Sequence, residues 1–478
     1  MKALYWFRND LRINDNEALH ELCNKADLWL PFYCLDEKEL QNTTLGFPKT
    51  GKYRLQFLKE SLQDLANQLN DQQVNLLVTR GNTVEILKQL LTDYKIEALY
   101  YHAEVTHEEV VIENAIKQFC TENNIKVIEY WGNTLYHKDD LVIPVEKLPD
   151  VFTQFRQKHE KYDIVRKLFP KPQKFPKAIP ETSNYKIELN EILEQAELDK
   201  RAALQFIGGE TQALKRLQYY LFESKKIEQY KFTRNELLGA DYSSKFSAWL
   251  ALGCISPRTI YFAIKNYETH IKSNVSTYWL VFELIWRDYF RFVALKYGNR
   301  IFKECGIKED KNIKANSTSI EEQKKIFAAW CNGKTGIPFI DANMIELQQT
   351  GFMSNRGRQN VASFLVKDLQ VDWRWGASWF ESLLIDYDVC SNYGNWLYVA
   401  GVGNDPRENR YFNILFQIEK YDANGAYVKH WLPELQLLPK EFIHRPYLLS
   451  AEEKQFYKIE HFPKPILDIQ YWKSNSTK

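Results

Sequence analysis

The sequence lacks the features that define several large classes of protein. Its seven cysteines form no Cys-x-x-Cys pair, which argues against a disulfide framework, a zinc site or a four-cysteine iron–sulfur cluster. Its 63 Lys and Arg balance 62 Asp and Glu, so net charge indicates no polyanionic partner, although a local basic patch stays open. No apolar run reaches the length of a membrane span, and the charged start MKALYWFRNDLR contains no secretory signal. These absences predict a reduced, cytoplasmic protein with no membrane contact.

The sequence is instead rich in aromatic residues. Its 478 residues include 13 Trp, 28 Tyr and 28 Phe, which together make up 14% of the chain. Two interpretations are open, a large hydrophobic core or a pocket for a large planar ligand. The length suggests two or three domains, and 45% hydrophobic with 26% charged residues excludes disorder as the main state.

Residues 1–135 alternate between strand-like and helix-like patterns. The clearest helical stripe runs through leucines 55, 58, 62, 65 and 69. This alternation predicts an α/β domain with a parallel, Rossmann-like sheet that binds ligands at the carboxyl ends of its strands. No Gly-x-Gly-x-x-Gly follows the first apolar run, so the usual dinucleotide fingerprint is missing. The predicted strands are residues 4–7, 28–35, 76–78, 99–102 and 127–130.

Two further regions follow. Residues 136–195 include four prolines within 169–181, which predicts a long linker on the surface, held down by Phe152, Phe155 and Phe175. Residues 196–478 show helical periodicity and predict an all-α domain that ends in a frayed polar tail, SNSTK. Within this domain we expect loops at 239–244, 298–318 and 386–410.

Three segments of the helical region carry groups suited to chemistry. The run SSKFSAWLALGCISPR begins with Ser243, Ser244 and Ser247 ahead of an apolar helix. Serines at that place either cap the helix or help bind a phosphate at its N-terminus. The run WLVFELIWRDYFR places five side chains on one helical face, which predicts either a polar cavity or a solvated ion pair: Trp279, Glu283, Trp286, Arg287 and Phe290.

The third group of residues comes from two stretches, GFMSNRGRQN at 351–360 and LIDYDVCSNYGNWLY at 384–398. Arg358 and Asp386 suit a buried ion pair. Asp386 and Asp388 lack a third metal ligand at suitable spacing, which argues against a metal site. Trp373 and Trp396 are core residues on the simplest interpretation.

Together these segments resemble the photolyase/cryptochrome family, in particular its DASH cryptochromes, from Lys2 to about Pro446. The stretches that carry the resemblance are FRNDLRINDNEAL, YKFTRNELLGADYSSKFSAWLALGCISPR, ELIWRDYFRF, GKTGIPFIDANMIELQQTGFMSNRGRQNVASFLVKDLQVDW and LLIDYDVCSNYGNWLYVAGVGNDPRENRYF. The resemblance implies an α/β antenna domain, a long linker and a helical domain that binds FAD. It also implies blue-light-driven repair of cyclobutane pyrimidine dimers by electron transfer from excited reduced FAD.

The resemblance assigns roles to individual residues. It implies that Asn392 faces flavin N5, where a neutral amide does not oppose electron uptake. It implies that Glu283 and Trp286 contact a flipped dimer. The cofactor contacts that it implies are Tyr230, Ser243, Ser244, Lys245, Phe246, Ser247, Arg287, Asn355, Arg358, Asp386 and Asp388. Our candidates for DNA contacts are Arg356, Tyr398, Arg407 and Arg410.

Several positions refine this assignment. Tyr398 replaces a second dimer-contacting tryptophan, a mark of relatives that prefer single-stranded DNA. Gln359 and Asn360 stand where (6-4) photolyases carry histidines, which argues against (6-4) repair. Trp396 and Trp373 match the inner members of the family's electron-transfer chain, but Ile320 occupies the outermost position. Electrons then need another exit, for which Trp330, Trp375 and Trp379 are the candidates.

Glu104 matches an antenna contact for 5,10-methenyltetrahydrofolate in DASH relatives, and otherwise is a surface carboxylate. A photoreceptor that signals through flavin redox state is the main alternative function. A flavin oxidoreductase or an inert structural relative is the third, but no substrate-pocket signature supports it. We expect a monomer.

Overall fold

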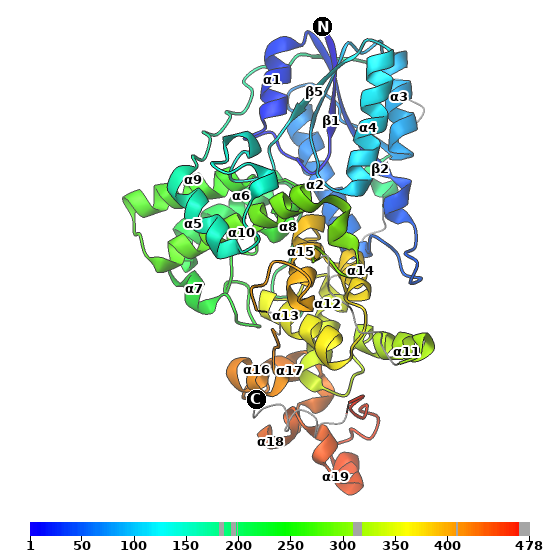
Figure 1. Cartoon of the computed structure of the whole chain (residues 1–478), viewed down its shortest axis with the longest axis vertical. Helices are drawn as coiled ribbons and strands as arrows, with labels where there is room; N and C mark the ends of the chain where they lie inside the picture. Colours follow the sequence, from blue (N-terminus) through cyan, green and yellow to red (C-terminus); the bar gives the residue numbers. More distant parts are fainter. Residues whose placement is uncertain (181–185, 193–196, 198, 309–317, 408–409, 468–478) are drawn as a thin grey trace.

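The computed structural model describes residues 1–478 except 181–185, 193–196, 198, 309–317, 408–409 and 468–478 (Figure 1). The frayed tail predicted for SNSTK lies outside the described residues, as does part of the predicted linker. The described part of the chain contains no helix that is long and apolar enough to cross a membrane.

The N-terminal part contains a parallel sheet in the order β3-β2-β1-β4-β5, with β6 paired to β2. All five strands expected from the sequence are present, so the predicted parallel α/β architecture is confirmed. The strands are β1 (Lys2–Phe7), β2 (Leu28–Asp36), β3 (Leu77–Gly81), β4 (Ala98–His102), β5 (Lys126–Tyr130) and β6 (Lys177–Ala178).

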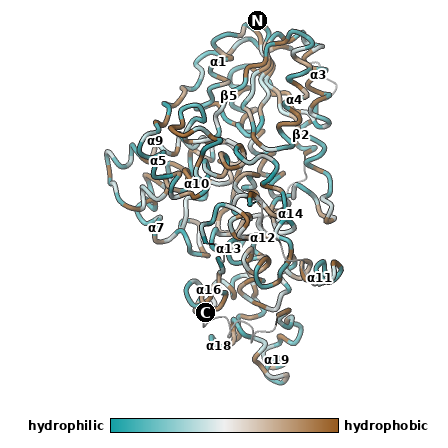
Figure 2. The backbone as a smooth tube through the Cα atoms, viewed as in Figure 1, coloured by the Kyte–Doolittle hydropathy of each residue, from teal (hydrophilic) through white to brown (hydrophobic). Residues whose placement is uncertain are grey.

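Helices cover both faces of this sheet. Alternate residues of β1 enter different cores: Tyr5 and Phe7 pack into one, and Leu4 and Trp6 into the other. The first core includes α1 (Glu17–Lys25) and α2 (Lys52–Asn70), and the second includes α3 (Thr83–Asp93) and α4 (His107–Glu122). In Figure 2 hydrophobic colours run along the strands in the upper part of the molecule. The central strands β1, β2 and β4 are therefore buried on both sides, as their continuous apolar runs indicate, whereas the edge strand β5 is partly exposed.

The connecting segment is held against both parts of the chain. Its helix α5 (Phe152–Tyr162) stacks Phe152 on Trp286, with ring centroids 3.6 Å apart. Further along, Phe175 stacks on Trp29 at 5.8 Å, next to the short strand β6. The anchoring by phenylalanines that the sequence predicts is confirmed at Phe152 and Phe175.

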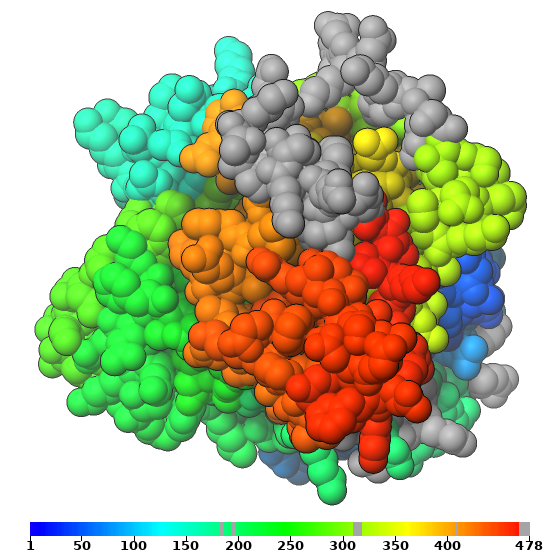
Figure 3. Space-filling view, turned by 90° about the horizontal axis from the view of Figure 1, so that it is seen from below, coloured from blue at the N-terminus to red at the C-terminus, as the bar shows by residue number. Residues whose placement is uncertain are grey.

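After β6 the described residues form helices and no further strand, which confirms the all-α C-terminal region. Its longest helix, α10 (Val275–Tyr297), is capped by Asn274. The other α-helices are α6 (Glu210–Gln218), α7 (Tyr230–Thr233), α8 (Ser247–Ala251), α9 (Pro257–His270), α11 (Ile320–Cys331), α12 (Pro338–Thr350), α13 (Asn355–Ser363), α14 (Trp373–Leu383), α15 (Val389–Ala400), α16 (Ile414–Tyr421), α17 (Ala426–Trp431), α18 (Lys440–Ile443) and α19 (Ala451–Phe456). In Figure 3, which views the end of the molecule opposite the sheet, C-terminal residues in orange and red occupy the middle of the face, beside green segments of the helical region.

The loop expected over 386–410 is wrong for half its length, because α15 occupies Val389–Ala400. Within α15, a Cβ at Gly394 would lie 2.2 Å from the Phe290 ring, so glycine permits close packing of α15 on α10. Residues Asn355–Ser363 likewise form a helix, α13. Gly357 lies within α13, where a Cβ would lie 2.1 Å from Asn343 Oδ1.

Candidate functional site

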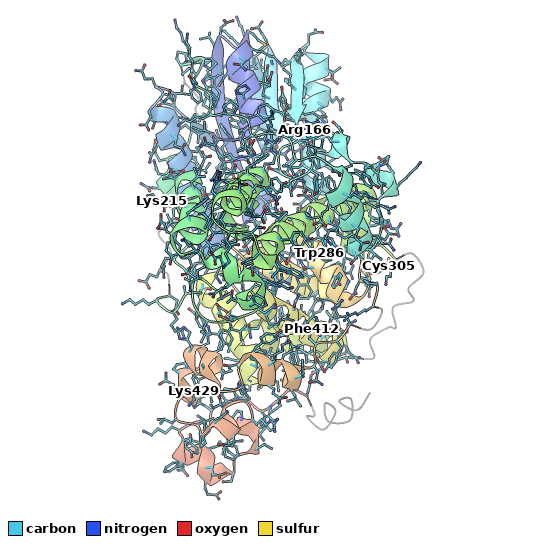
Figure 4. The ribbon with its side chains drawn as sticks, turned by 90° about the vertical axis from the view of Figure 1, so that its left-hand side faces the viewer. Arg166, Lys215, Trp286, Cys305, Phe412 and Lys429 are labelled. Carbon is cyan, nitrogen blue, oxygen red and sulfur yellow. The ribbon has the colours of Figure 1, made fainter. Side chains whose placement is uncertain are left out.

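A cavity of about 790 Å³ opens in the helical part of the molecule. Most of the residues singled out from the sequence line it, although they come from four separate stretches of chain. These are Tyr230, Ser243, Ser244, Lys245, Phe246, Ser247, Glu283, Trp286, Arg287, Asn355, Arg358, Asp386, Asp388, Tyr398, Arg407 and Arg410. Figure 4 labels Trp286, on α10, and Phe412, both of which line this cavity.

The serine segment forms one side of the cavity, but not as a helix cap. Helix α8 begins at Ser247 and has no side-chain cap, so the capping interpretation is wrong. Arg216, which does not line the cavity, donates to the carbonyl oxygens of Ser243 and Ser244 at 3.2 and 3.1 Å. These carbonyls are thereby occupied, and the serine hydroxyls and backbone N–H groups are left as the segment's polar groups for a ligand.

Lys245 lies in the same segment, and its side chain is buried. Its Nζ lies 3.3 Å from the ring centroid of Tyr242 and 4.6 Å from that of Phe352. Burial lowers the pKa of this amine well below its usual value, although Glu346 opposes the shift. Burial therefore disfavours the charged form of this amine.

The predicted polar face of α10 lines the cavity with all five of its side chains. Glu283 forms an ion pair with Arg234, a residue that no sequence motif had singled out. Burial raises the pKa of the Glu283 carboxyl, and Arg234 opposes that shift. Arg234 follows Tyr230 by four residues in YKFTR, a spacing that places both side chains on one face of a helix. This spacing could have predicted that Arg234 lines the same cavity as Tyr230.

The ion pair between Arg358 and Asp386 is present, with Nη2 at 2.9 Å from Oδ2. Arg358 Nε also donates to the carbonyl oxygen of Met353 at 2.9 Å. Asp388 caps α15 through a 2.7 Å bond from Ser391 N and lies 3.6 Å from Arg287. Burial would raise the pKa of Asp388, but Arg287 and Arg291 outweigh it and keep the pKa low. Among the described residues, no three His, Cys, Asp or Glu are grouped to hold a metal.

A smaller cavity of about 100 Å³ adjoins the first and is lined by Asn392 and Trp396. Asn392 is 8% exposed and donates from Nδ2 to the carbonyl oxygen of Ala377 at 3.1 Å. That bond leaves the amide oxygen as the group available to a ligand. Trp373 lines neither cavity; its Nε1 donates to the carbonyl oxygen of Glu304 at 3.0 Å.

The candidate DNA contacts are not equivalent. The ring of Tyr398 meets that of Trp286 edge to face at 5.9 Å, so the two form a corner of the cavity. Arg410 is already paired with Asp405 and donates to Tyr398 Oη at 2.9 Å. Arg356 lies outside the cavity lining and donates to Asn235 Oδ1 at 3.1 Å.

A second cavity of about 550 Å³ lies at the carboxyl ends of β1, β2 and β4. Glu104 lines it and is 8% exposed, so its interpretation as a surface carboxylate is wrong. Its carboxylate pairs with Arg291 and accepts from Asn133 Nδ2 at 3.1 Å. Arg287 and Asp388 line both large cavities and therefore form part of a shared wall.

Comparison with known proteins agrees with this geometry. Residues 3–177 match the family model described as DNA photolyase, and residues 279–478 match the model described as the FAD binding domain of DNA photolyase. The parallel sheet and the helical cavity thus define a photolyase-type fold with a flavin-binding domain.

Individual relatives narrow the assignment. The chain is 48% identical to a protein named Cryptochrome DASH from Synechocystis, over 98% of this chain and 95% of that protein. It is 49% identical to Cryptochrome DASH from Xenopus laevis, over 97% and 89%. The crystal structure of Synechocystis cryptochrome superposes with a TM-score of 0.92 at 47% identity, covering 100% of this chain and 98% of that one. The chain belongs to the photolyase/cryptochrome family, in its cryptochrome DASH branch.

Proposed function

We propose that the protein repairs cyclobutane pyrimidine dimers, mainly in single-stranded DNA, in a reaction driven by blue light and FAD. One observation carries the proposal: a carboxylate, Glu283, and an aromatic corner, Trp286 with Tyr398, line the same cavity as the expected flavin contacts. A protein that only senses light has no need of such a corner.

The residues of the cavity fit FAD. Two polar atoms that line it, Trp279 Nε1 and Gln359 Oε1, are buried without a hydrogen-bond partner among the described residues. Buried polar atoms of this kind are normally satisfied, which favours a polar ligand. Residues 243–247 would hold the phosphates, and Arg358, Asp386 and Asn392 the ring system. When bound and reduced, FAD supplies a single electron after absorbing light.

The chain's own residues would bind and orient the damaged dinucleotide. Trp286 offers a flat face for stacking, and Tyr398 closes the corner at right angles to it. A dimer is already poorly stacked, so extruding it costs less than extruding paired bases, and single-stranded DNA lowers that cost further. Glu283 would accept or donate a hydrogen bond at the base edge, depending on its protonation. Arg407, which is exposed at the cavity, would contact the DNA backbone.

The second cavity is our candidate site for the antenna, 5,10-methenyltetrahydrofolate. Glu104 is fixed there by Arg291 and Asn133, so its carboxylate is oriented before any ligand binds. We expect Glu104→Gln to lose bound folate, seen as a near-ultraviolet shoulder, while FAD is retained. The matched control is Glu97→Gln, whose side chain is 62% exposed. Equal folate in both variants would remove Glu104 from the site.

Blue-light treatment of dimer-containing oligothymidine tests the main proposal. Single- and double-stranded substrates would be compared with the reduced protein, and dimer loss measured. Faster light-dependent repair of the single strand is expected. Flavin bands without repair would favour the photoreceptor alternative, in which light changes the redox state for a partner protein. A monomeric state and a cytoplasmic location remain predictions that gel filtration and localisation would check.

A further inference from the structure

Aromatic residues of the described chain form a connected path from the smaller cavity, which Asn392 and Trp396 line, to the surface. This path, beside the proposed flavin site, avoids the position of Ile320. The path begins at Trp396, which lines the smaller cavity. The ring centroid of Trp330 lies 6.4 Å from that of Trp396, edge to face. Phe327 stacks on Trp330 at 5.8 Å and meets Trp375 at 5.4 Å. Trp375 is partly exposed.

We propose that electrons reach the flavin cavity along this path, from Trp375 through Trp330 to Trp396, and that Trp375 is the surface terminus. The inference rests on the FAD-binding part of the proposed function and is independent of DNA repair. Phe327 is too hard to oxidise to hold the charge, so it serves only as a bridge between two indoles.

The environments of the indole nitrogens favour this terminus. Trp330 is fully buried, and its Nε1 donates to the carbonyl oxygen of Val361 at 3.1 Å. An oxidised Trp330 therefore has no water to take its proton and passes the charge on. Trp375 reaches solvent, where an oxidised indole can release its N–H proton and be trapped as a neutral radical.

The two competing exits are less suitable. Trp379 packs edge to face on Phe47 at 5.0 Å, and its Nε1 is buried without a partner among the described residues. Trp373 is 4% exposed and meets the ring of Tyr393 at 6.1 Å. Ile320, 53% exposed at the start of α11, cannot hold the charge.

Electrons and protons balance at each step of this path. Trp396 gives one electron to the light-excited oxidised flavin, Trp330 replaces it, and Trp375 replaces the electron of Trp330. Trp375 then loses its indole proton to water. An external thiol returns one electron and one proton to Trp375, and two such thiol radicals combine into a disulfide.

The test is photoreduction of the full-length, FAD-loaded, oxidised protein under blue light with dithiothreitol, followed by flavin absorbance. Transient absorption would record the tryptophan radical. Trp330→Phe and Trp375→Phe are expected to lose most of the photoreduction rate, and Trp375→Phe to lose the long-lived neutral radical. Trp379→Phe, on the same helix as Trp375, is the matched control and should keep the parental rate. Ile320→Trp should add a second exit and restore photoreduction to Trp375→Phe.

FAD content and melting temperature would show that each variant folds. If Trp330→Phe fails to fold, Trp375→Phe at the surface decides the question. Parental rates in both variants, or loss of photoreduction in Trp373→Phe alone, would overturn the proposal. Chemically reduced protein bypasses the path, so repair by dithionite-reduced Trp375→Phe should equal that of the parent. Absence of repair in every reduced sample would count against the repair function and leave the path unaffected.

Discussion

Arg234 and Glu283 are ion-paired across the cavity wall, one from the end of α7 and the other from the middle of α10. The pair fixes one oxygen of the carboxylate and lowers a pKa that burial alone would raise further. A base edge that enters the cavity therefore meets a carboxylate already oriented, at no further cost in side-chain entropy.

We expect Glu283→Ala to retain FAD and lose most of the repair yield, because the hydrogen bond to the dimer is lost while the flavin contacts remain. The repair yield of Glu283→Gln, which keeps a hydrogen-bonding group of the same size, should lie between that of the parent and that of Glu283→Ala. The measurement is dimers repaired per photon absorbed at equal flavin content. An unchanged yield in Glu283→Ala would remove the residue from the mechanism.

Asn392→Asp should change which flavin redox state accumulates under blue light. The neutral amide is held by Ala377, and a carboxylate in its place would repel an electron arriving nearby. Spectra recorded during photoreduction report the redox states directly. Asn266→Asp, exposed on α9 and outside the lining of both cavities, is the control. An identical course in parent and Asn392→Asp would contradict the assignment of Asn392 to N5.

Arg358→Met should lower stability and FAD retention together. It leaves Asp386, whose side chain is 2% exposed, as an unpaired buried carboxylate, a change that costs about 3–5 kcal/mol. The double variant Arg358→Met with Asp386→Leu removes both charges and should regain stability but not FAD. Urea unfolding gives the free energy of unfolding, and gel-filtered samples give the flavin content. Full FAD content in the double variant would show that the pair serves only the fold.

Glu346 gives the protein a pH-dependent stability. Burial raises its pKa to about 7, while the Tyr427 hydroxyl, which donates to Oε2 at 2.6 Å, opposes the shift. Between the ordinary glutamate pKa and about 7 the folded state binds more protons than the unfolded state, so stability falls as pH rises through this window. Glu346→Gln keeps an acceptor for Tyr427 and should gain on the order of 2 kcal/mol relative to the parent at pH 8.

Urea unfolding at pH 5 and pH 8 checks this expectation. The gain should be present at the higher pH and small at the lower one, where the parental carboxyl is already protonated. Glu85→Gln, exposed on α3, is the control and should leave the slope unchanged. An equal effect of Glu346→Gln at both values would refute the linkage.

The sequence predicts the strands and the polar face of α10 well, because both follow from periodicity within one element. Prediction from the sequence fails where the role of a residue depends on a contact with a residue far away in the chain. The loop expected over 386–410 contains α15, in which Gly394 permits close approach of α10. The serines suggested either a helix cap or a phosphate site, and the start of α8 at Ser247 without a side-chain cap excludes only the first.

Some residues of the two cavities escaped prediction for the same reason. Arg291 pairs with Glu104 across 187 positions of sequence, and no local pattern indicates such a pair. Glu381 is buried at the cavity that contains Glu104, and burial raises its pKa to about 7. Glu381 lies on the amphipathic helix α14, and its spacing from other residues of that helix does not predict that it lines a cavity.

Arg287 and Asp388 line both large cavities, so ligands bound in the two cavities would contact the same two side chains. A ligand that shifts either side chain on one side changes the local field and hydrogen bonds offered on the other. By thermodynamic reciprocity, any effect of the first ligand on the affinity for the second returns with equal size. We therefore expect the binding constant of either proposed ligand to depend on whether the other cavity is filled.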